Sequence, residues 1–376
     1  MVRARDTDAC PGAFQVHQAA DGVLLRIRLP GGMITAAQLA ALSTVSSELG
    51  SGTLELTARG NLQLRGITDA AAVADAIVPL FTQAGLLPSA THERVRNIVA
   101  SPLSGRVGGN ADVRPWVGEL DATICAEPRL AELGGRFWFS LDDGSADVSG
   151  LGADVGAHVF EDGCALLLMG RDTGIRLAVG DVIKALVAIA LRFTEIRGTS
   201  WRINELSDVQ HLMPGVELTG TPFPPRTKPP VGWISQEDGR VALGAAVPLG
   251  VLPARAAGYL AAIEAPLVIT PWRSVLVCDL DEGVADVALR VLAPLGLVFD
   301  ERSPWLNLSA CTGSPGCALS VADVRADAAQ SLQADSALQT DSAEHRHFVG
   351  CDRACGSPPS GQVLVATGDG YRALRP

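Results

Sequence analysis

The sequence predicts an α+β protein that arose by duplication of one structural unit. Two observations lead to this class. Short alternating strands and helical stretches follow one another in the order strand, helix, strand, strand, helix. The same five elements recur in the same order roughly 210 residues later. Agreement of five elements in order indicates an internal repeat, and this grouping of strands with helices is typical of the α+β class.

Each copy begins with an alternating strand that ends at a proline-containing turn. Asp21–Gly32 reads DGVLLRIRLPGG, and residues 238–250 read DGRVALGAAVPLG. A helical stretch with apolar residues three to four positions apart follows in each copy, at residues 35–49 and 253–264. The opening strand and helix are therefore predicted twice.

A strand pair comes next in each copy and aligns Thr57 with Thr270. A second helix follows, and in both copies it ends in Gly-Leu. The copies close with RNIVASPLSG and LNLSACTGSPG, in which Asn97 matches Asn307. In chain order, the paired segments are 53–68 and 266–281, 70–86 and 283–297, and 96–105 and 306–316.

The rest of the chain separates and follows the two copies. An α/β segment contains the strands GRFWFSLDD and CALLLMG and the apolar helix VGDVIKALVAIALRF, and a Pro-rich passage then leads to the second copy. After the second copy we expect a helix in ALSVADVRADAAQSLQADSALQ and a final strand in GQVLVATGDGYRAL. The expected domains are the first repeat at 1–106, the α/β domain at 107–213, the linker at 214–232, the second repeat at 233–306 and a cysteine-bearing domain at 307–376.

Composition excludes several classes of protein. The formal net charge is -11, which disfavours nonspecific nucleic-acid binding because that requires a basic surface. The N-terminal residues MVRARDTDACPGAF include no apolar signal segment, and no apolar run reaches the roughly 18 residues of a membrane helix. We therefore expect a soluble, cytoplasmic protein that binds neither nucleic acid nor membranes.

Four of the eight cysteines form two pairs, C-x5-C and C-x3-C, near the end of the chain. A Gly/Pro-bearing loop and a short turn that supply four thiolates favour a cuboidal iron-sulfur cluster. Zinc sites usually have two to four residues between paired cysteines. Two disulfides would be unusual in the expected compartment, and four unconnected thiols remain an alternative. The predicted cluster ligands are Cys311, Cys317, Cys351 and Cys355.

Three further motifs carry a resemblance to a known family. They are LLRIRLPGGMIT at Leu24–Thr35, LTARGNLQLRGI at Leu56–Ile67, and RNIVASPLSG at Arg96–Gly105. With the cysteine spacing, they resemble the sulfite and nitrite reductase hemoproteins over nearly the whole chain. The resemblance implies two ferredoxin-like half repeats with α/β domains that bind a 4Fe-4S cluster and a tetrapyrrole. In that family the four cysteines hold the cluster, and the last can bridge to siroheme iron.

The same resemblance implies an anion site for the tetrapyrrole. A macrocycle with acetate and propionate side chains requires several guanidinium groups. Strand alternation predicts that Arg26 and Arg28 share a face, and likewise Arg59, Gln63 and Arg65. A solvated surface charge is the alternative for each arginine. The predicted substrate-binding residues are Arg26, Arg28, Thr57, Arg59, Gln63, Arg96, Asn97 and Arg136.

The sequence departs from the reductases at their oxyanion site. Arg136 and Trp138 stand where the reductases carry a Lys-x-Lys pair, and a tryptophan side chain supplies neither an acidic proton nor a charge. With GCDRACGSPP as the second cysteine motif, the chain is similar to the branch of the family that acts in aerobic cobalamin biosynthesis. This implies a monooxygenase that uses O2 to hydroxylate precorrin-3A and close a γ-lactone, with the tetrapyrrole as its substrate.

The resemblance further implies a non-heme iron and a separate electron donor, either an NAD(P)H-linked reductase or a ferredoxin. Spacing does not identify the iron ligands. His17 is a weak candidate, whereas His345 and His347 share one strand face and are better interpreted as surface residues. A siroheme-dependent sulfite or nitrite reductase is the alternative function, and a noncatalytic electron carrier is a second alternative.

Overall fold

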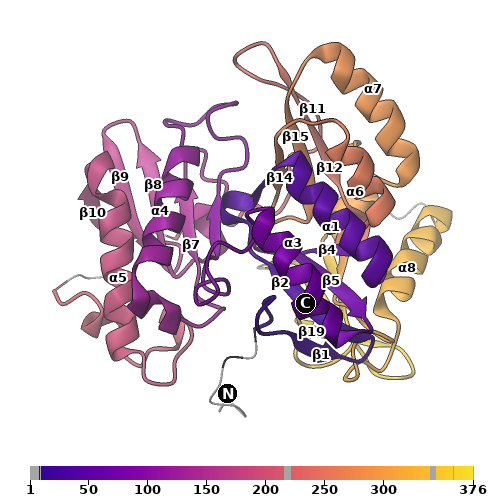
Figure 1. Ribbon diagram of the computed structural model, residues 1–376, viewed down its shortest axis with the longest axis horizontal. Helices are drawn as coiled ribbons and strands as arrows, with labels where there is room; N and C mark the ends of the chain where they lie inside the picture. The colour runs from indigo at the N-terminus through magenta and orange to yellow at the C-terminus, as the bar shows by residue number, and fades with distance from the viewer. Residues whose placement is uncertain (1–7, 9, 216–221, 339–343, 359, 376) are drawn as a thin grey trace. The chain divides into compact units, whose positions relative to one another are not determined.

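The computed structural model describes residues 8, 10–215, 222–338, 344–358 and 360–375 (Figure 1). These residues form two compact units, each of which combines separate parts of the chain. The first unit comprises residues 1–15, 27–33 and 85–226, and the second comprises residues 16–26, 34–84 and 227–376.

The first unit is built on one five-stranded sheet with the order β10-β9-β8-β7-β6. β6, β7 and β8 are parallel, and β8, β9 and β10 are antiparallel. α4 packs against β6, and α5 packs against β8. These elements are β6 (Ile98–Ala100), α4 (Arg114–Ala126), β7 (Phe139–Asp142), β8 (Val155–Phe160), β9 (Gly163–Leu168), β10 (Arg171–Leu177) and α5 (Val182–Ile196).

The core of this unit explains why the α5 segment is so apolar. The rings of Phe137 and Phe193 lie 5.1 Å apart between their centroids, and Phe137 also meets Phe139 edge-on at 5.3 Å. All three side chains are fully buried. Burial of one apolar helix face on a sheet supplies the main stabilisation of such a layer.

The second unit contains two five-stranded sheets, one for each repeat. Their strand orders are β1-β2-β5-β4-β13 and β11-β12-β15-β14-β3. The elements of the first repeat are β1 (His17–Ala19), β2 (Gly22–Ile27), β3 (Met33–Ile34), α1 (Ala36–Leu49), β4 (Thr53–Leu56), β5 (Leu62–Ile67), α2 (Ala70–Ala72) and α3 (Val78–Gln83). Those of the second are β11 (Gly232–Ser235), β12 (Val241–Ala246), β13 (Val251–Pro253), α6 (Ala254–Ala261), β14 (Leu267–Ile269), β15 (Ser274–Leu280) and α7 (Glu282–Leu292).

The two repeats exchange their edge strands. β13 of the second repeat pairs with β4 of the first, and β3 of the first repeat lies beside β14 of the second. α1 and α6 pack side by side (Figure 1). The exchange leaves the repeats interlocked around one shared helix pair, and it confirms the predicted duplication.

Backbone conformation matches between the repeats even where the residue type differs. The turn before β3, Pro30–Gly32, has its central residue Gly31 at a φ of 64°, and the turn before β13, Pro248–Gly250, has Leu249 at 54°. A leucine rarely adopts this left-handed conformation. The surrounding fold therefore imposes the turn on both sequences.

A four-stranded sheet with the order β16-β17-β18-β19 completes the second unit. Its β16 and β17 are parallel, as are β17 and β18, whereas β18 and β19 form an antiparallel hairpin. α8 packs on β16 and β17. The elements are β16 (Leu308–Ala310), α8 (Val324–Leu338), β17 (Arg346–Val349), β18 (Gln362–Ala366) and β19 (Tyr371–Arg375).

This sheet has the same strand directions as β6 to β9 of the first unit. In both sheets a helix, α4 or α8, connects the first two parallel strands. The duplication therefore extends beyond the five elements found in the sequence and includes the domain that follows each repeat. The predicted duplicated α+β class is confirmed in this extended form.

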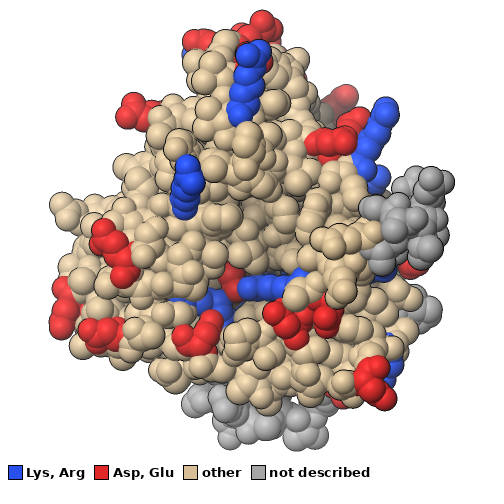
Figure 2. Space-filling view, turned by 90° about the vertical axis from the view of Figure 1, so that its right-hand side faces the viewer, with Lys and Arg blue, Asp and Glu red and all other residues tan. Residues whose placement is uncertain are grey.

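The predicted five-domain division stays a prediction, because the compact units combine segments that are distant in the sequence. Within the expected linker at 214–232, residues 216–221 lie outside the described residues. Among the described residues, none of the helices combines the length and apolarity needed to cross a membrane. On the face seen in Figure 2, acidic and basic side chains are interspersed over a largely uncharged surface.

Candidate metal centre

Two of the predicted cluster cysteines lie at the ends of adjacent parallel strands. Cys311 follows β16 directly, and Cys351 follows β17 after one glycine. The backbone N–H of Cys311 donates to the carbonyl of Phe348 at 2.9 Å, so Cys311 continues the pairing of β16 with β17. Because parallel strands end at the same sheet edge, both cysteines are brought there by the fold.

Backbone turns place the other two cysteines. The N–H of Cys317 donates to the carbonyl of Gly313 at 2.8 Å, which closes the loop that begins at Cys311. The N–H of Ala354 donates to the carbonyl of Cys351 at 3.1 Å and forms the turn that leads to Cys355. Hydrogen bonds inside each cysteine pair therefore set the positions of the thiols.

The four thiols lie close enough to affect one another's ionisation. Burial raises the pKa of the Cys355 thiol, and the nearby Cys311, Cys351 and Cys317 raise this pKa further. Burial also raises the pKa of the Cys311 thiol, with a contribution from Cys317 and Cys351. Thiolates in such a group are stable only when they share a positive partner, which a bound metal cluster provides.

Backbone amides support the sulfur of Cys311. The N–H of Gly350 donates to Cys311 Sγ at 3.3 Å, and hydrogen bonds from Gly350 and Gly313 oppose the burial that raises the pKa of this thiol. Amide donors directed at a thiolate ligand are typical of protein-bound iron-sulfur clusters, whose electronic properties they modify.

The donor set fits a cuboidal cluster better than a single metal ion. All eight cysteines are free thiols, so the disulfide alternative is wrong for the structure described. Within the described part of the chain, no group of three or more His, Cys, Asp or Glu side chains converges as ligands of one ion. A cuboidal cluster differs from zinc because each thiolate binds a different iron atom. Its ligands therefore surround a volume, as these four thiols can.

Two histidines lie near the second cysteine pair: His347 is on β17, and His345 directly precedes that strand. The Ser309 hydroxyl is hydrogen bonded to His345 Nε2 at 2.8 Å and to His347 Nδ1 at 2.7 Å. His347 Nε2 is 3.0 Å from the carbonyl oxygen of Cys355. The surface interpretation is wrong for His347, which is fully buried. Its ring positions the cysteine turn.

These contacts leave the iron ligands unassigned. Both ring nitrogens of His347 have hydrogen-bond partners. Burial, followed by the nearby Arg273, lowers the pKa of His345 to about 4, so its ring is neutral at neutral pH. His17 is exposed on β1. Among the described residues, the structure identifies no His/carboxylate set for iron.

Four of the predicted substrate-binding residues lie in the second unit. Arg26 Nε donates to Gln63 Oε1 at 2.8 Å, and a second guanidinium nitrogen, Nη2, donates to the same oxygen. Gln63 Nε2 in turn donates to Glu55 Oε2 at 3.0 Å. These contacts fix the orientation of Arg26 on the sheet. Its assignment as a substrate ligand stays a prediction.

Thr57 and Arg59 lie in the turn between β4 and β5. The Thr57 hydroxyl accepts hydrogen bonds from the N–H groups of Arg59 at 3.3 Å and Asn61 at 3.1 Å. The expectation that Arg59 shares a strand face with Gln63 and Arg65 is therefore wrong. The sequence signal was the Thr57 cap with Gly60, which has a φ of 67° and marks a turn.

The other four predicted residues lie in the first unit. Arg28 donates to Pro11 O at 2.6 Å and to Asn97 Oδ1 at 3.2 Å, and all but 2% of its surface is buried. Asn97 also donates to the carbonyls of Gly135 and Phe137. These contacts join the segment after β2 to the chain entering β6 and β7. They give Arg28 and Asn97 a positioning role, and their contact with a substrate stays a prediction.

Arg96 and Arg136 differ sharply in environment. Arg96 is buried and makes two hydrogen bonds of 2.7 Å to the carboxylate of Asp121. Arg136 is exposed, and its guanidinium lies 5.4 Å from the ring centroid of Trp201. The sequence did not reveal the Asp121 partner, because α4 brings it to Arg96 from 25 residues away. Both substrate assignments stay predictions.

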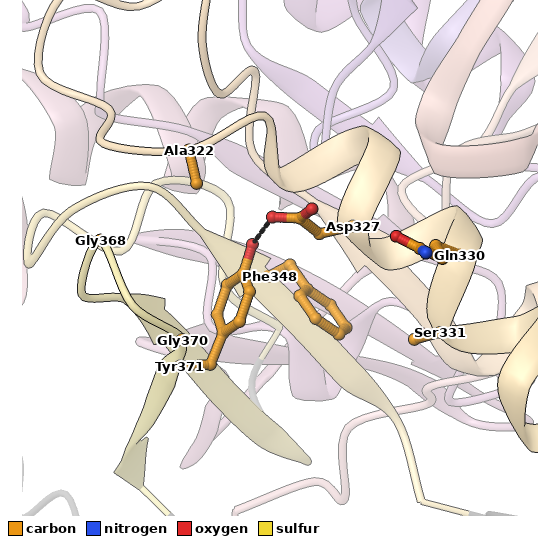
Figure 3. Close-up of a pocket in the computed structure, with 8 residues that line it drawn as sticks. All are labelled: Ala322, Asp327, Gln330, Ser331, Phe348, Gly368, Gly370 and Tyr371. Atoms are coloured by element: carbon orange, nitrogen blue, oxygen red, sulfur yellow. Dashed lines mark hydrogen bonds between the residues drawn. The ribbon is translucent and has the colours of Figure 1, made fainter.

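A pocket of about 520 Å³ is lined by α8, by Phe348 of β17 and by the hairpin of β18 and β19 (Figure 3). The Tyr371 hydroxyl points at the Asp327 carboxylate and donates to it at 2.5 Å. The rings of Tyr371 and Phe348 meet edge-on, 5.0 Å apart between centroids. Cys311 packs against the same apolar cluster. The pocket is thus separated from the cysteine site by one layer of side chains.

The sequence also missed Gly350 and Ser309 as parts of this centre. Both act through the neighbouring strand, since Gly350 of one segment contacts Cys311 of the other and Ser309 contacts two histidines 36 and 38 residues away. The sequence signal that could have shown this is a spacing of two residues, which places side chains on the same face of a strand. Ser309 precedes Cys311 by two positions, as His345 and His347 are two apart.

The geometry and the comparisons together define a nitrite/sulfite reductase-like architecture. Residues 16–77, which form most of the first repeat, match the model of the nitrite/sulfite reductase ferredoxin-like half domain. The solved structure of the Mycobacterium tuberculosis NirA protein superposes with a TM-score of 0.75 at 21% identity, covering 94% of this chain and 77% of that one. This likeness establishes the fold.

Within that class, the chain resembles one enzyme over nearly its whole length. It is 29% identical to a precorrin-3B synthase from Sinorhizobium sp. over 96% of this chain and 81% of the relative. A ferredoxin–nitrite reductase from Leptolyngbya laminosa is 40% identical over 22% of this chain and 16% of its own length. The predicted resemblance to precorrin-3B synthase and to the nitrite/sulfite reductases is thereby confirmed.

Proposed function

We propose that this chain is an oxidoreductase of aerobic cobalamin biosynthesis that converts precorrin-3A into precorrin-3B. The whole-length similarity to precorrin-3B synthase carries this proposal. Four mutually close thiols at the end of β16 and β17 support it, because they suit an electron-transferring cluster.

Cys311, Cys317, Cys351 and Cys355 would hold a 4Fe-4S cluster, which supplies one-electron transfer when it is bound. The chain's own residues prepare this site. The Gly350 amide donates to the Cys311 sulfur, and His347 contacts the carbonyl oxygen of Cys355. These groups hold the thiols in place.

The proposed reaction balances with a separate electron donor. One atom of O2 enters the substrate as a hydroxyl, and the other leaves as water, which consumes two electrons and two protons from an NAD(P)H-linked reductase or a ferredoxin. The oxygen atom and the ring A acetate add to the two carbons of one C=C bond of the macrocycle; the π bond breaks, the carboxyl proton ends on the new hydroxyl, and the γ-lactone closes. A non-heme iron is proposed for oxygen activation, and its ligands are unassigned.

Arginines would bind the carboxylates of the macrocycle. Arg26 is held by Gln63, so its guanidinium is oriented before the substrate binds. Arg59 lies in the capped turn at Thr57. Guanidinium groups fixed in this way pair with carboxylates in bidentate geometry.

Conversion of precorrin-3A under labelled oxygen tests the proposal. The anaerobically reconstituted chain, mixed with precorrin-3A, a reductase and ¹⁸O2, should yield a product that carries one ¹⁸O atom and a lactone. Reduction of sulfite or nitrite without conversion of precorrin-3A would instead favour a siroheme-dependent reductase, for which the local similarity to a nitrite reductase is the supporting observation. Electron transfer without either conversion would favour the noncatalytic carrier.

A further inference from the structure

Arg65, on β5 of the first repeat, reaches the first cysteine loop. Its Nε and Nη2 make a two-pronged contact with the Asp21 carboxylate at 3.0 and 2.9 Å. The same Nη2 donates to the carbonyl of Gly316 at 2.6 Å, directly before Cys317. The Arg65 side chain is only 8% exposed. A strand of the first repeat is therefore bonded to the loop that carries two predicted cluster ligands.

Arg273, from the second repeat, reaches the other cysteine motif. Its Nη2 donates to the carbonyl of Gly356 at 2.9 Å, directly after Cys355. Space for this side chain depends on two glycines. A Cβ at Gly250 would lie 2.7 Å from Arg273 Cδ, and a Cβ at Gly356 would lie 2.9 Å from Arg273 Nη2. The absence of a side chain at these two glycines therefore leaves the space that the Arg273 side chain occupies.

Arg273 adopts a backbone conformation that is unfavourable for an arginine. Its φ is 57°, in the left-handed region, and the equivalent residue of the first repeat is Gly60, with a φ of 67°. The turn itself is equally well served by glycine. Strain retained at such a position points to a requirement for the side chain, and the described contact of its guanidinium is with the cysteine motif.

Glu55 is an acidic residue that lies near the arginines of both contacts. Its Oε1 lies 2.6 Å from Arg325 Nη2 on α8 and 3.8 Å from Arg65 Nε. Burial lowers the pKa of Arg273, and the nearby Arg325 lowers and Glu55 raises this pKa. The three arginines outnumber the two carboxylates, Asp21 and Glu55, by one positive charge. Arg273, whose described guanidinium contact is the carbonyl of Gly356, therefore brings its positive charge next to Cys355.

We propose that Arg65 and Arg273 are paired positioning residues, one from each repeat, that hold the two cysteine segments and favour the reduced state of the cluster. This inference rests on the proposed function for its redox part. Each arginine bonds to a carbonyl next to a cysteine, so it orients the ligand without touching the metal. Positive charge and donated hydrogen bonds near a cluster stabilise its more negative, reduced form.

Arg273→Gly tests the inference most directly, because glycine is the residue at the equivalent position 60 and adopts a positive φ without strain. We expect its cluster to have a more negative midpoint potential by EPR-monitored titration. We also expect about tenfold faster loss of cluster absorbance to a chelator, as for loss of one charge-assisted hydrogen bond. Arg65→Lys should give a smaller change of the same sign, because lysine keeps the charge without the fork. Arg240→Ala, which removes an exposed arginine of the same unit, should match wild type.

Hydrogen exchange of the metal-free chain separates this inference from the proposed function. In the metal-free chain, the amides of residues 354–357 should exchange faster in Arg273→Gly than in wild type, and those of residues 313, 314, 316 and 317 faster in Arg65→Lys. If wild type forms no cluster, the proposed function fails while this exchange still tests the positioning role. Unchanged exchange in both variants overturns the inference. In a wild type that forms a cluster, an unchanged potential and chelator resistance overturn its redox part.

Discussion

The carboxyl ends of β6 in the first unit and β16 in the second have the same backbone arrangement. The N–H of Ser101, just after β6, donates to the carbonyl of Leu141 on the parallel strand β7 at 3.1 Å. The N–H of Cys311, just after β16, donates to the carbonyl of Phe348 on the parallel strand β17 at 2.9 Å. Ser101 and Cys311 are thus structural equivalents.

Their side chains also accept equivalent hydrogen bonds. The N–H of Asp143 donates to Ser101 Oγ at 3.1 Å, and the N–H of Gly350 donates to Cys311 Sγ at 3.3 Å. The Ser101 hydroxyl donates a hydrogen bond to Asp147 Oδ1 at 2.6 Å, whereas Cys311 lies near the three other thiols. One backbone frame therefore supports two chemistries. A change of oxygen to sulfur at one position separates a strand end that organises a loop from one that carries a predicted metal ligand.

Replacing the two equivalent residues, Cys311 and Ser101, should give the largest difference in cluster content. Cys311→Ser should abolish the cluster signal in the reduced EPR spectrum and lower the iron and sulfide content, because one of four thiolate ligands is lost. Ser101→Ala should retain the cluster, since its contacts are with Asp143 and Asp147. A Cys311→Ser protein with the wild-type signal would refute the ligand assignment.

The next largest effect is expected in the loop after β7. Asp142 is fully buried and accepts hydrogen bonds of 2.9 to 3.0 Å from the N–H groups of Gly144, Ala146, Val148 and Ser149. Asp142→Asn replaces one acceptor oxygen by a donor, which should lower the free energy of unfolding by about 3 kcal/mol. Denaturant unfolding measures this, and a change below about 1 kcal/mol would contradict a carboxylate-built loop.

Asp147, which accepts the hydrogen bond from Ser101, should make the stability of the folded protein depend on pH. Burial, followed by the nearby Asp142, raises the pKa of Asp147 from 3.8 to about 7. The folded state therefore binds this proton more tightly than the unfolded state. The stabilisation that comes from this tighter proton binding is complete below pH 4, and it is lost as the pH rises through 7.

Asp147→Asn tests this sign, because the amide keeps an acceptor for Ser101 and does not titrate. Thermal unfolding of both proteins from pH 4 to pH 8 should show wild type losing stability relative to the variant as the pH rises. A constant difference across that range would mean that Asp147 does not titrate there.

The smallest effect concerns the pocket beside the cysteines. Tyr371→Phe removes the hydrogen bond to Asp327 and should cost about 1 kcal/mol of unfolding free energy. Cluster content should be unchanged, because the ring still packs against Phe348. Loss of iron in this variant would show that the pocket wall is coupled to the metal site.

Much of the fold follows from the sequence because period and order persist after the residues have diverged. The strand, helix, strand, strand, helix pattern survives in both copies, so the duplicated α+β class was predictable. The correspondence of the two following sheets was missed. Apart from positions such as Ser101 and Cys311, their residues share direction and pairing rather than sequence, and strand direction is not encoded in periodicity alone.

The candidate site was predictable where chemistry depends on residue type and spacing. The four cysteines were found in this way. Partners brought together by tertiary structure were not, as Arg96 with Asp121 and Arg65 with the Gly316 carbonyl show. The sequence likewise did not indicate that Arg273 contacts the second cysteine motif. Its contact with Gly356 depends on a left-handed turn that residue type would not suggest.

The absorption spectrum of the anaerobically purified full-length chain tests the central claim most directly. We propose that the second copy binds an iron-sulfur cluster and that the tetrapyrrole is a substrate rather than a resident cofactor. The purified chain should therefore show a broad cluster absorbance that bleaches on reduction, without heme bands. A siroheme Soret and charge-transfer band in the purified protein would contradict it.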